Sequence, residues 1–130
     1  MEVAHDFFQQ NLQPGITEAF RKHHFDPDIY KQLGEMGFLG CTLKDYGGSG
    51  VSSVAYGLIN REIERVDSSY RSALSVQSSL VIHPIHKFGT KKVKDKYLED
   101  LMKGEIVGCF GLTEPNVGSD PGGMSTTCRQ

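Results

Sequence analysis

Apolar side chains recur along most of the chain at the spacing of amphipathic helices. Between residues 1 and 104 these stripes are separated by Pro, Gly, Ser and Asp, which commonly end or begin helices. The pattern predicts helices over about 1–13, 16–23, 26–37, 52–66, 67–88 and 90–104. We therefore expect a mainly α protein whose first domain, residues 1–104, is a helical bundle.

The stripes also predict which face of each helix is buried. The apolar positions are Val3, Phe7, Phe8 and Leu12 in the first helix, Ile29, Leu33 and Met36 in the third, Ala55, Ile59, Ile63 and Val66 in the fourth, and Val93, Tyr97, Leu98, Leu101 and Met102 in the last. Side-chain caps are expected at Asp26, Ser52 or Ser53, Asp67 and Thr90. The helix that begins near Tyr70 has many serines and few charges, so we expect it to be central, with Leu80 among its packed residues and a kink or end at Pro84.

The pattern changes after Gly104. Residues 106–110 are a short apolar, partly β-branched run, and residues 110–120 form a stretch rich in hydroxyls, glycine and proline. Such a run is typical of a strand, so residues 105–130 are predicted to begin a β domain. The stretch that follows fits either a plain turn or a ligand-binding loop.

Composition and charge narrow the class of protein. The chain has 130 residues, 38% of them hydrophobic and 23% charged, with a net charge of −2 and both signs interspersed. The chain has no excess of basic residues, so its charge does not indicate nucleic acid or an anionic membrane surface as a partner. Apolar runs such as Leu80 to Ile82 are far too short to span a bilayer, and no signal or transit peptide is expected in residues 1–10.

Two features that can signal a ligand site do not do so here. The three cysteines are widely spaced and form no zinc pattern with the histidines, so no metal site is expected. Residues 47–50 read Gly-Gly-Ser-Gly, but no lysine followed by serine or threonine comes after them. This loop is therefore better explained as a flexible connection between helices than as a phosphate-binding loop.

Two motifs after the helical bundle, taken together, resemble those of a known protein family. Phe110-Gly111-Leu112-Thr113-Glu114-Pro115 and, shortly after, Gly118-Ser119-Asp120 follow a helical bundle. This arrangement resembles the flavin-dependent acyl-CoA dehydrogenases, and residues 45–50 and 89–98 agree with it. Residues 65–80 are most similar to the glutaryl-CoA dehydrogenases within that family.

The resemblance implies a cofactor and the residues that hold it. FAD is the expected cofactor, with a contact surface made of Phe110, Gly111, Leu112, Thr113, Gly118 and Ser119. Ser119 would also bond the pantetheine side of an acyl-CoA. No catalytic residue is expected in this chain, because the family's glutamate base lies far downstream of residue 130. Glu114 precedes a proline in the loop and is expected to be structural.

The resemblance also implies a substrate-binding arginine. Arg71 would meet the distal carboxylate of a dicarboxylic acyl chain, with Ser72 beside it, and a planar guanidinium suits that task. Spacing alone favours a different interpretation, a helical ion pair with Asp67 four residues earlier. Glu64 is expected on the surface, although its charge would balance that of Arg71.

The function implied for the full-length protein is oxidation of glutaryl-CoA to crotonyl-CoA and CO₂. Electrons would pass to an electron-transfer flavoprotein, in lysine and tryptophan breakdown in the mitochondrial matrix, with the enzyme a homotetramer. This chain alone is expected to be inactive and to bind FAD poorly. Two alternatives remain open: another acyl-CoA dehydrogenase with a short or branched monocarboxylic substrate, and a non-catalytic helical binding module.

Overall fold

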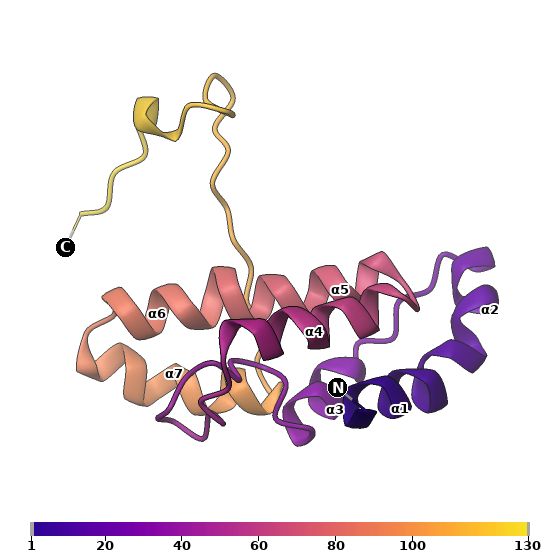
Figure 1. Cartoon of the computed structure of the whole chain (residues 1–130). Coiled ribbons are helices and arrows are strands. Elements are labelled where there is room, and N and C mark those ends of the chain that lie inside the picture. The colour runs from indigo at the N-terminus through magenta and orange to yellow at the C-terminus, as the bar shows by residue number, and fades with distance from the viewer. Residues whose placement is uncertain (1, 130) are drawn as a thin grey trace.

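The computed structural model describes residues 2–129 as a bundle of helices from which the C-terminal segment rises away (Figure 1). The elements in chain order are α1 (Glu2–Asn11), the 3₁₀ turn η1 (Gln13–Gly15), α2 (Ile16–Arg21), α3 (Ile29–Glu35), α4 (Ser53–Glu64), α5 (Ser68–Ser75), the π-helical segment η2 (Val76–Ile82), α6 (His83–Phe88), α7 (Lys91–Lys103) and the 3₁₀ turn η3 (Pro121–Gly123). The mainly α fold expected from the sequence is confirmed.

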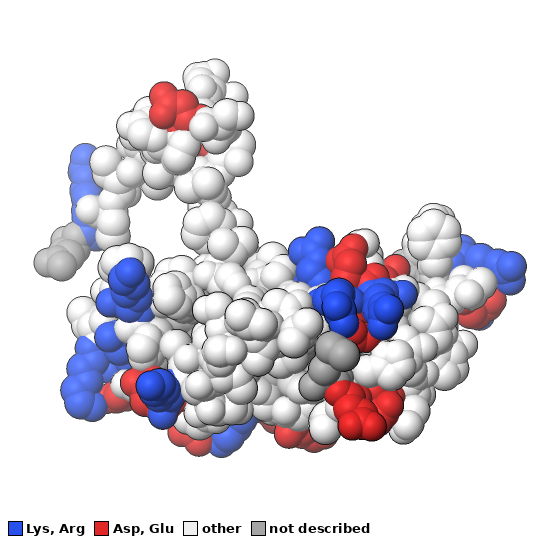
Figure 2. Space-filling view, viewed as in Figure 1, with Lys and Arg blue, Asp and Glu red and all other residues white. Residues whose placement is uncertain are grey.

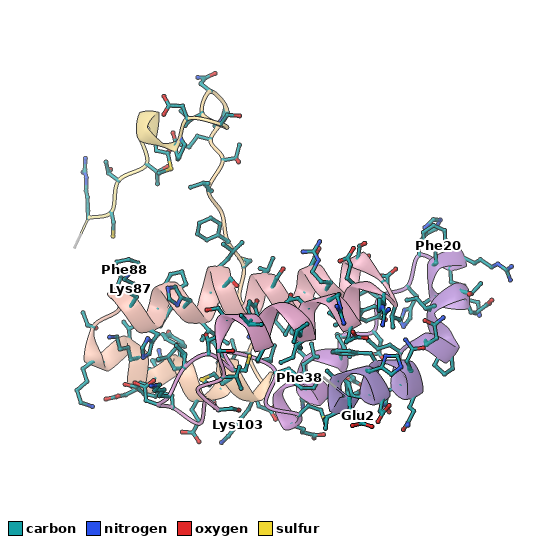
Figure 3. The ribbon with its side chains drawn as sticks, viewed as in Figure 1. Glu2, Phe20, Phe38, Lys87, Phe88 and Lys103 are labelled. Carbon is teal, nitrogen blue, oxygen red and sulfur yellow. The ribbon has the colours of Figure 1, made fainter. Side chains whose placement is uncertain are left out.

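The N-terminal helix α1 packs against α4 and the chain after α3. Phe8 is fully buried, and its ring centroid lies 5.6 Å from that of Phe38, which lies beside α1 (Figure 3). Ala4, one turn before Phe8, is buried as well. The prediction that Val3 is buried is wrong, since its side chain is 64% exposed. Val3 lies in the first turn of α1, where Ala4 is the residue that faces the core.

Most of the predicted caps begin helices as expected. The Ser52 hydroxyl accepts the N–H of Ala55 at the start of α4. The Asp67 carboxylate accepts the N–H of Ser69 at 2.7 Å at the start of α5. Thr90 caps α7 in the same way. Asp26 differs: its carboxylate accepts the N–H of Asp28 in a turn that precedes α3, because the first residues after Pro27 are not yet α-helical.

The longest helical run is formed by α5, η2 and α6, which follow one another without a break (Figure 1). Pro84 lies in the first turn of α6, directly after the π-helical segment. Proline has no N–H to donate, and a wider π turn accommodates the shifted hydrogen-bond pattern. Of the kink or end expected at Pro84, the end is not seen, and the helical run continues to Phe88, where its last turn was expected. The expectation that Leu80 is packed is also wrong, since its side chain is exposed.

The core lies between this long helix and the helices around it. Its fully buried side chains come from α1, α3, α4, α5, η2, α7 and the chain after α3, and they include Phe8, Ile29, Leu33, Leu39, Ile63, Leu74, Ile82 and Leu98. The last helix, α7, ends at Gly104 as predicted, with φ at 74°. A Cβ at Gly104 would lie 2.0 Å from the carbonyl oxygen of Tyr30, so both the turn and the contact with α3 require glycine.

The strand expected over residues 106–110 is not formed. Within residues 2–129 the only β pairing is an isolated antiparallel bridge between Glu114 and Val117. A strand is defined by hydrogen bonds to a neighbouring strand, and no extended segment of the described chain lies alongside residues 106–110. The segment instead leaves the bundle as irregular chain (Figure 1).

Charged side chains are unevenly distributed over the surface. On the face shown in Figure 2, lysines, arginines and acids gather toward the two ends of the bundle and along its lower edge, and the area between them is largely uncharged. The three cysteines are free thiols, and burial raises the pKa of Cys41. Among residues 2–129 no helix has the length and apolarity needed to cross a membrane, and no three potential metal ligands cluster together.

Candidate functional site

The predicted substrate arginine lies on the first turn of α5 and is held by two side chains. Arg71 donates from Nε to a carboxylate oxygen of Glu64 at 2.7 Å and from Nη1 to the hydroxyl of Ser75 at 3.2 Å. Its side chain is 36% exposed, so the guanidinium is half-buried. The pair joins the last turn of α4 to α5 and fixes the guanidinium in one orientation.

Spacing alone offered an ion pair of Arg71 with Asp67 as an alternative interpretation, and the structure does not form that pair. The Asp67 carboxylate accepts backbone N–H groups at the start of α5, so it is turned toward the helix end. Glu64 takes its place from across the turn between the two helices. A hydrogen bond from Ser68 and then the contact with Arg71 lower the pKa of Glu64, so it stays a carboxylate at neutral pH.

Ser72 lies beside Arg71 on α5 and is half-buried. Its carbonyl oxygen accepts the hydroxyl proton of Ser75 at 3.2 Å. Ser75 therefore donates to Ser72 while it accepts from Arg71, and it belongs to the same polar network. Sequence reasoning did not single out Ser75, although its position one turn after Arg71 was a usable signal.

The predicted flavin-binding residues lie on the exposed C-terminal segment. Phe110 is 49% exposed and Leu112 is 38% exposed, which is unusual for large apolar side chains. Gly111 and Gly118 have open space around them, since an added Cβ would meet nothing within 4 Å. Thr113 and Ser119 are also exposed. These residues thus offer accessible apolar surface, backbone amides and hydroxyls on one segment.

Glu114 closes the end of this segment into a loop. Its carboxylate accepts the backbone N–H of Ser125 at 2.9 Å and that of Thr126 at 2.7 Å, and it also accepts both hydroxyl groups. These bonds, led by the Ser125 amide, lower the pKa of Glu114 to about 2. The contacts agree with the structural role expected for Glu114, and they place Ser119 at the middle of a closed loop.

The site that the sequence predicts is therefore in two parts in this chain. Arg71 and Ser72 belong to the helical bundle, where Arg71 is bonded to Glu64 and Ser75. The loop that carries Ser119 is held mainly by bonds within residues 114–126. A hollow of about 610 Å³ lies beside α6 and is lined in part by Tyr56 and His83, but Arg71 does not line it.

The comparison with known families decides what kind of domain this is. The sequence model of the family described as "Acyl-CoA dehydrogenase, N-terminal domain" matches residues 1–105. The chain belongs to the acyl-CoA dehydrogenase family. The resemblance read from the motifs is confirmed at this level.

Individual relatives show how much of a family member the chain represents. A short-chain specific acyl-CoA dehydrogenase of Megasphaera elsdenii is 37% identical over 130 residues, which are 97% of this chain and 34% of the relative. A glutaryl-CoA dehydrogenase structure from Mycobacterium smegmatis is 44% identical with a TM-score of 0.90, covering 95% of this chain and 32% of that one. A second structure from the same organism, in complex with FADH2, is 39% identical with a TM-score of 0.89, covering 93% and 31%. The chain spans about a third of the length of these acyl-CoA dehydrogenases.

Sequence reasoning did not identify the partners of two buried polar residues of this acyl-CoA dehydrogenase domain. Glu62 is buried on α4, where it contacts His5 Nδ1 at 3.0 Å and accepts hydrogen bonds from Arg61 and Arg65. The contact with His5 is the main reason that the pKa of Glu62 falls to about 2. This group ties α1 to α4 and lies apart from Arg71. The second residue, Gln77, lies on the helix expected to be central, and it contacts the start of the C-terminal segment.

Proposed function

We propose that this chain is the N-terminal part of an FAD-dependent acyl-CoA dehydrogenase whose full-length form oxidises and decarboxylates glutaryl-CoA. The products are crotonyl-CoA and CO₂. The observation that carries the choice of substrate is Arg71, a half-buried guanidinium held by Glu64 and Ser75. A cation fixed in this way suits the distal carboxylate of a dicarboxylic acyl chain.

The surroundings of Arg71 favour a bound carboxylate over a purely structural ion pair. Glu64 and Ser75 occupy Nε and Nη1, so within residues 2–129 the remaining N–H groups, including those of Nη2, stay open to a ligand. Glu64 balances the charge of Arg71 when no ligand is present, which reduces the cost of half-burying it. A second carboxylate that approached the Nη2 side of the guanidinium would then be bound by directional hydrogen bonds as well as by charge.

The exposed segment fits the flavin that the family requires. Residues 110–113 offer the ring of Phe110, the side chain of Leu112, the hydroxyl of Thr113 and accessible amides, with open space at Gly111. Phe110, Gly111, Leu112, Thr113, Gly118 and Ser119 would hold the cofactor, and Ser119 would also bond the acyl-CoA. Bound FAD supplies the acceptor for the hydride that leaves Cβ. Amides and a hydroxyl beside its ring would stabilise the negative charge that results.

Several properties of the full-length protein are carried over by resemblance and are part of the same proposal. The base that removes the α-proton lies downstream of residue 130, so the chain by itself should be inactive and should bind FAD weakly. Electrons would pass to an electron-transfer flavoprotein, and the enzyme would be a homotetramer. Its place in lysine and tryptophan breakdown in the mitochondrial matrix also stays a prediction.

The proposal is tested by purifying the full-length protein and assaying two substrates. We expect a yellow flavoprotein that releases CO₂ and crotonyl-CoA from glutaryl-CoA and turns over butyryl-CoA less efficiently. A flavoprotein that prefers butyryl-CoA and releases no CO₂ would refute the glutaryl-CoA assignment. Strong flavin absorbance with dehydrogenase activity in the 130-residue chain alone would refute the expectation that this chain by itself is inactive and binds FAD weakly.

A second candidate function is dehydrogenation of a short or branched monocarboxylic acyl-CoA. The identity to a short-chain specific relative favours it. In that case Arg71 would be a structural partner of Glu64 only. A third candidate, a non-catalytic helical binding module, is distinguished by the transcript beyond Gln130, because a stop codon there would favour the module.

A further inference from the structure

Gln77 is a fully buried amide that bonds the C-terminal segment at the point where it leaves the bundle. The side chain is 1% exposed and lies in the π-helical segment η2. Its Nε2 donates to the carbonyl oxygens of Leu101 at 2.9 Å and Ile106 at 2.8 Å. Its Oε1 accepts the N–H of Gly108 at 3.0 Å. One side chain thereby joins the long helix, the end of α7 and the start of the segment.

The backbone of Gly108 also packs tightly against the same helix. A Cβ at this position would lie 2.3 Å from Cγ1 of Val81, which is far inside van der Waals contact. Val81 follows Gln77 by one helical turn and is itself buried. The segment is therefore held at two successive turns, by hydrogen bonds at Gln77 and by close packing at Val81.

We propose that Gln77 is a positioning residue that sets where the loop of residues 110–120 stands relative to Arg71. The inference rests on the proposed function, in which that loop contacts the flavin and Arg71 contacts the substrate. Gln77 and Arg71 lie on one unbroken helical run, and Phe110 follows Gly108 after a single intervening residue. Fixing Gly108 on the helix therefore fixes the start of the loop against the helix that carries Arg71 (Figure 1).

An amide is the side chain that this position requires. It must donate to two carbonyl oxygens and accept from one N–H, and glutamine does both at once. A glutamate of the same shape would place a charged oxygen against two carbonyl oxygens. A methionine of similar length would leave all three backbone groups without this partner, in a buried site where that is costly.

The first test measures amide hydrogen exchange in the 130-residue chain. In Gln77→Met we expect exchange at the Gly108 amide to become about tenfold faster, with core amides of α5 unchanged. Ser78→Ala is the matched control, since Ser78 is also buried in η2 but bonds Gly40 instead. It should leave Gly108 unchanged. Exchange at Gly108 that changes less than about twofold in Gln77→Met would overturn the inference.

A second pair of variants keeps the inference testable if Gln77→Met unfolds the bundle. Gly108→Ala should move the segment off the helix, which NMR shifts of residues 108–113 will report, because its Cβ would overlap Val81. Adding Val81→Ala removes both overlapping methyl carbons and should restore the shifts. Gly111→Ala is the control, since its Cβ would meet nothing. A Gly108→Ala spectrum like that of Gly111→Ala would overturn the inference.

A third measurement, on the full-length flavoprotein, separates positioning from general stability. Gln77→Met should lower kcat and shift the flavin reduction potential, while KM for the acyl-CoA changes less than about threefold. Unchanged kcat and potential would overturn the inference even if the enzyme is active. A full-length protein that binds no flavin would refute the proposed function instead, and the exchange experiment would still report whether Gln77 anchors Gly108.

Discussion

The carboxylate of Glu114 gives the C-terminal loop a pH dependence that can be worked out from its bonds. The backbone amides of Ser125 and Thr126, together with their hydroxyls, hold its pKa at about 2, against an ordinary value of 4.5. Because these bonds form with the ionised carboxylate, they stabilise the closed loop fully at pH values above the ordinary pKa of 4.5. That stabilisation is lost as the pH falls through 4.5 toward 2, where the carboxylate takes up a proton.

The assay is an NMR titration of the Ser125 and Thr126 amides in the 130-residue chain. We expect both signals to hold their bonded positions down to about pH 3 and to move together with a midpoint near 2. Glu114→Gln should abolish this titration and shift both amides at every pH, because the amide cannot accept the full set of N–H and O–H donors.

The matched control is Glu105→Gln. It also removes one carboxylate near the segment, but that carboxylate pairs with Lys31 at 3.2 Å and not with the loop. The titration of the two loop amides should be the same in this variant as in the wild type. A wild-type midpoint near 4.5 for either amide would refute the reasoning, since it would show that the carboxylate is not bonded as described.

Three further predictions concern the bundle. Leu74→Ala should lower the free energy of unfolding in urea by about 2–5 kcal/mol, because Leu74 is fully buried, and a loss under about 1 kcal/mol would contradict its place in the core. Asp67→Ala should cost roughly 1 kcal/mol by removing the α5 cap; an unchanged urea midpoint would show that the cap contributes nothing. Gly104→Ala should cost at least about 1–2 kcal/mol through the left-handed turn alone, and a variant as stable as the wild type would contradict the close contact with Tyr30.

The features that sequence reasoning recovered depend on residues close together in the chain. Asp67 and Thr90 cap their helices as expected, and Gly104 ends α7, because each acts on backbone within a few residues. The helical stripes were likewise sufficient for the fold class. Val3 was misplaced by a small rotation of α1, which a stripe on a short helix does not determine.

The features that sequence reasoning missed depend on partners far along the chain. Gln77 bonds residues 24 to 31 positions away, and Glu62 meets His5 across 57 positions. Glu62 is a single polar residue on a helix, where a surface position is the usual expectation. Gln77 lies on the helix expected to be central, but its partners could not be read from the sequence. Spacing also offered Asp67 as a partner for Arg71, but its carboxylate is already used by the cap.

The strand expected over residues 106–110 illustrates a limit of a local pattern. Its apolar, β-branched composition is that of a strand, yet strand structure depends on a neighbour that pairs with it. The start of the segment meets the bundle, where the N–H of Ile106 donates to Asp100 and that of Gly108 donates to Gln77, and the chain after Gly108 leaves the bundle. The composition of residues 106–110 therefore indicated correctly that the helical bundle ends near Gly104, but it did not determine the structure that follows.

The most direct test of the proposed function compares Arg71→Ala with wild type in the full-length enzyme, on two substrates. We expect kcat/KM for glutaryl-CoA to fall roughly 100-fold and that for butyryl-CoA to fall no more than about threefold, because only the first has a carboxylate for Arg71. Arg21→Ala, an exposed arginine at the end of α2, is the control and should change neither. Equal losses on both substrates would contradict the account and would make Arg71 a structural partner of Glu64.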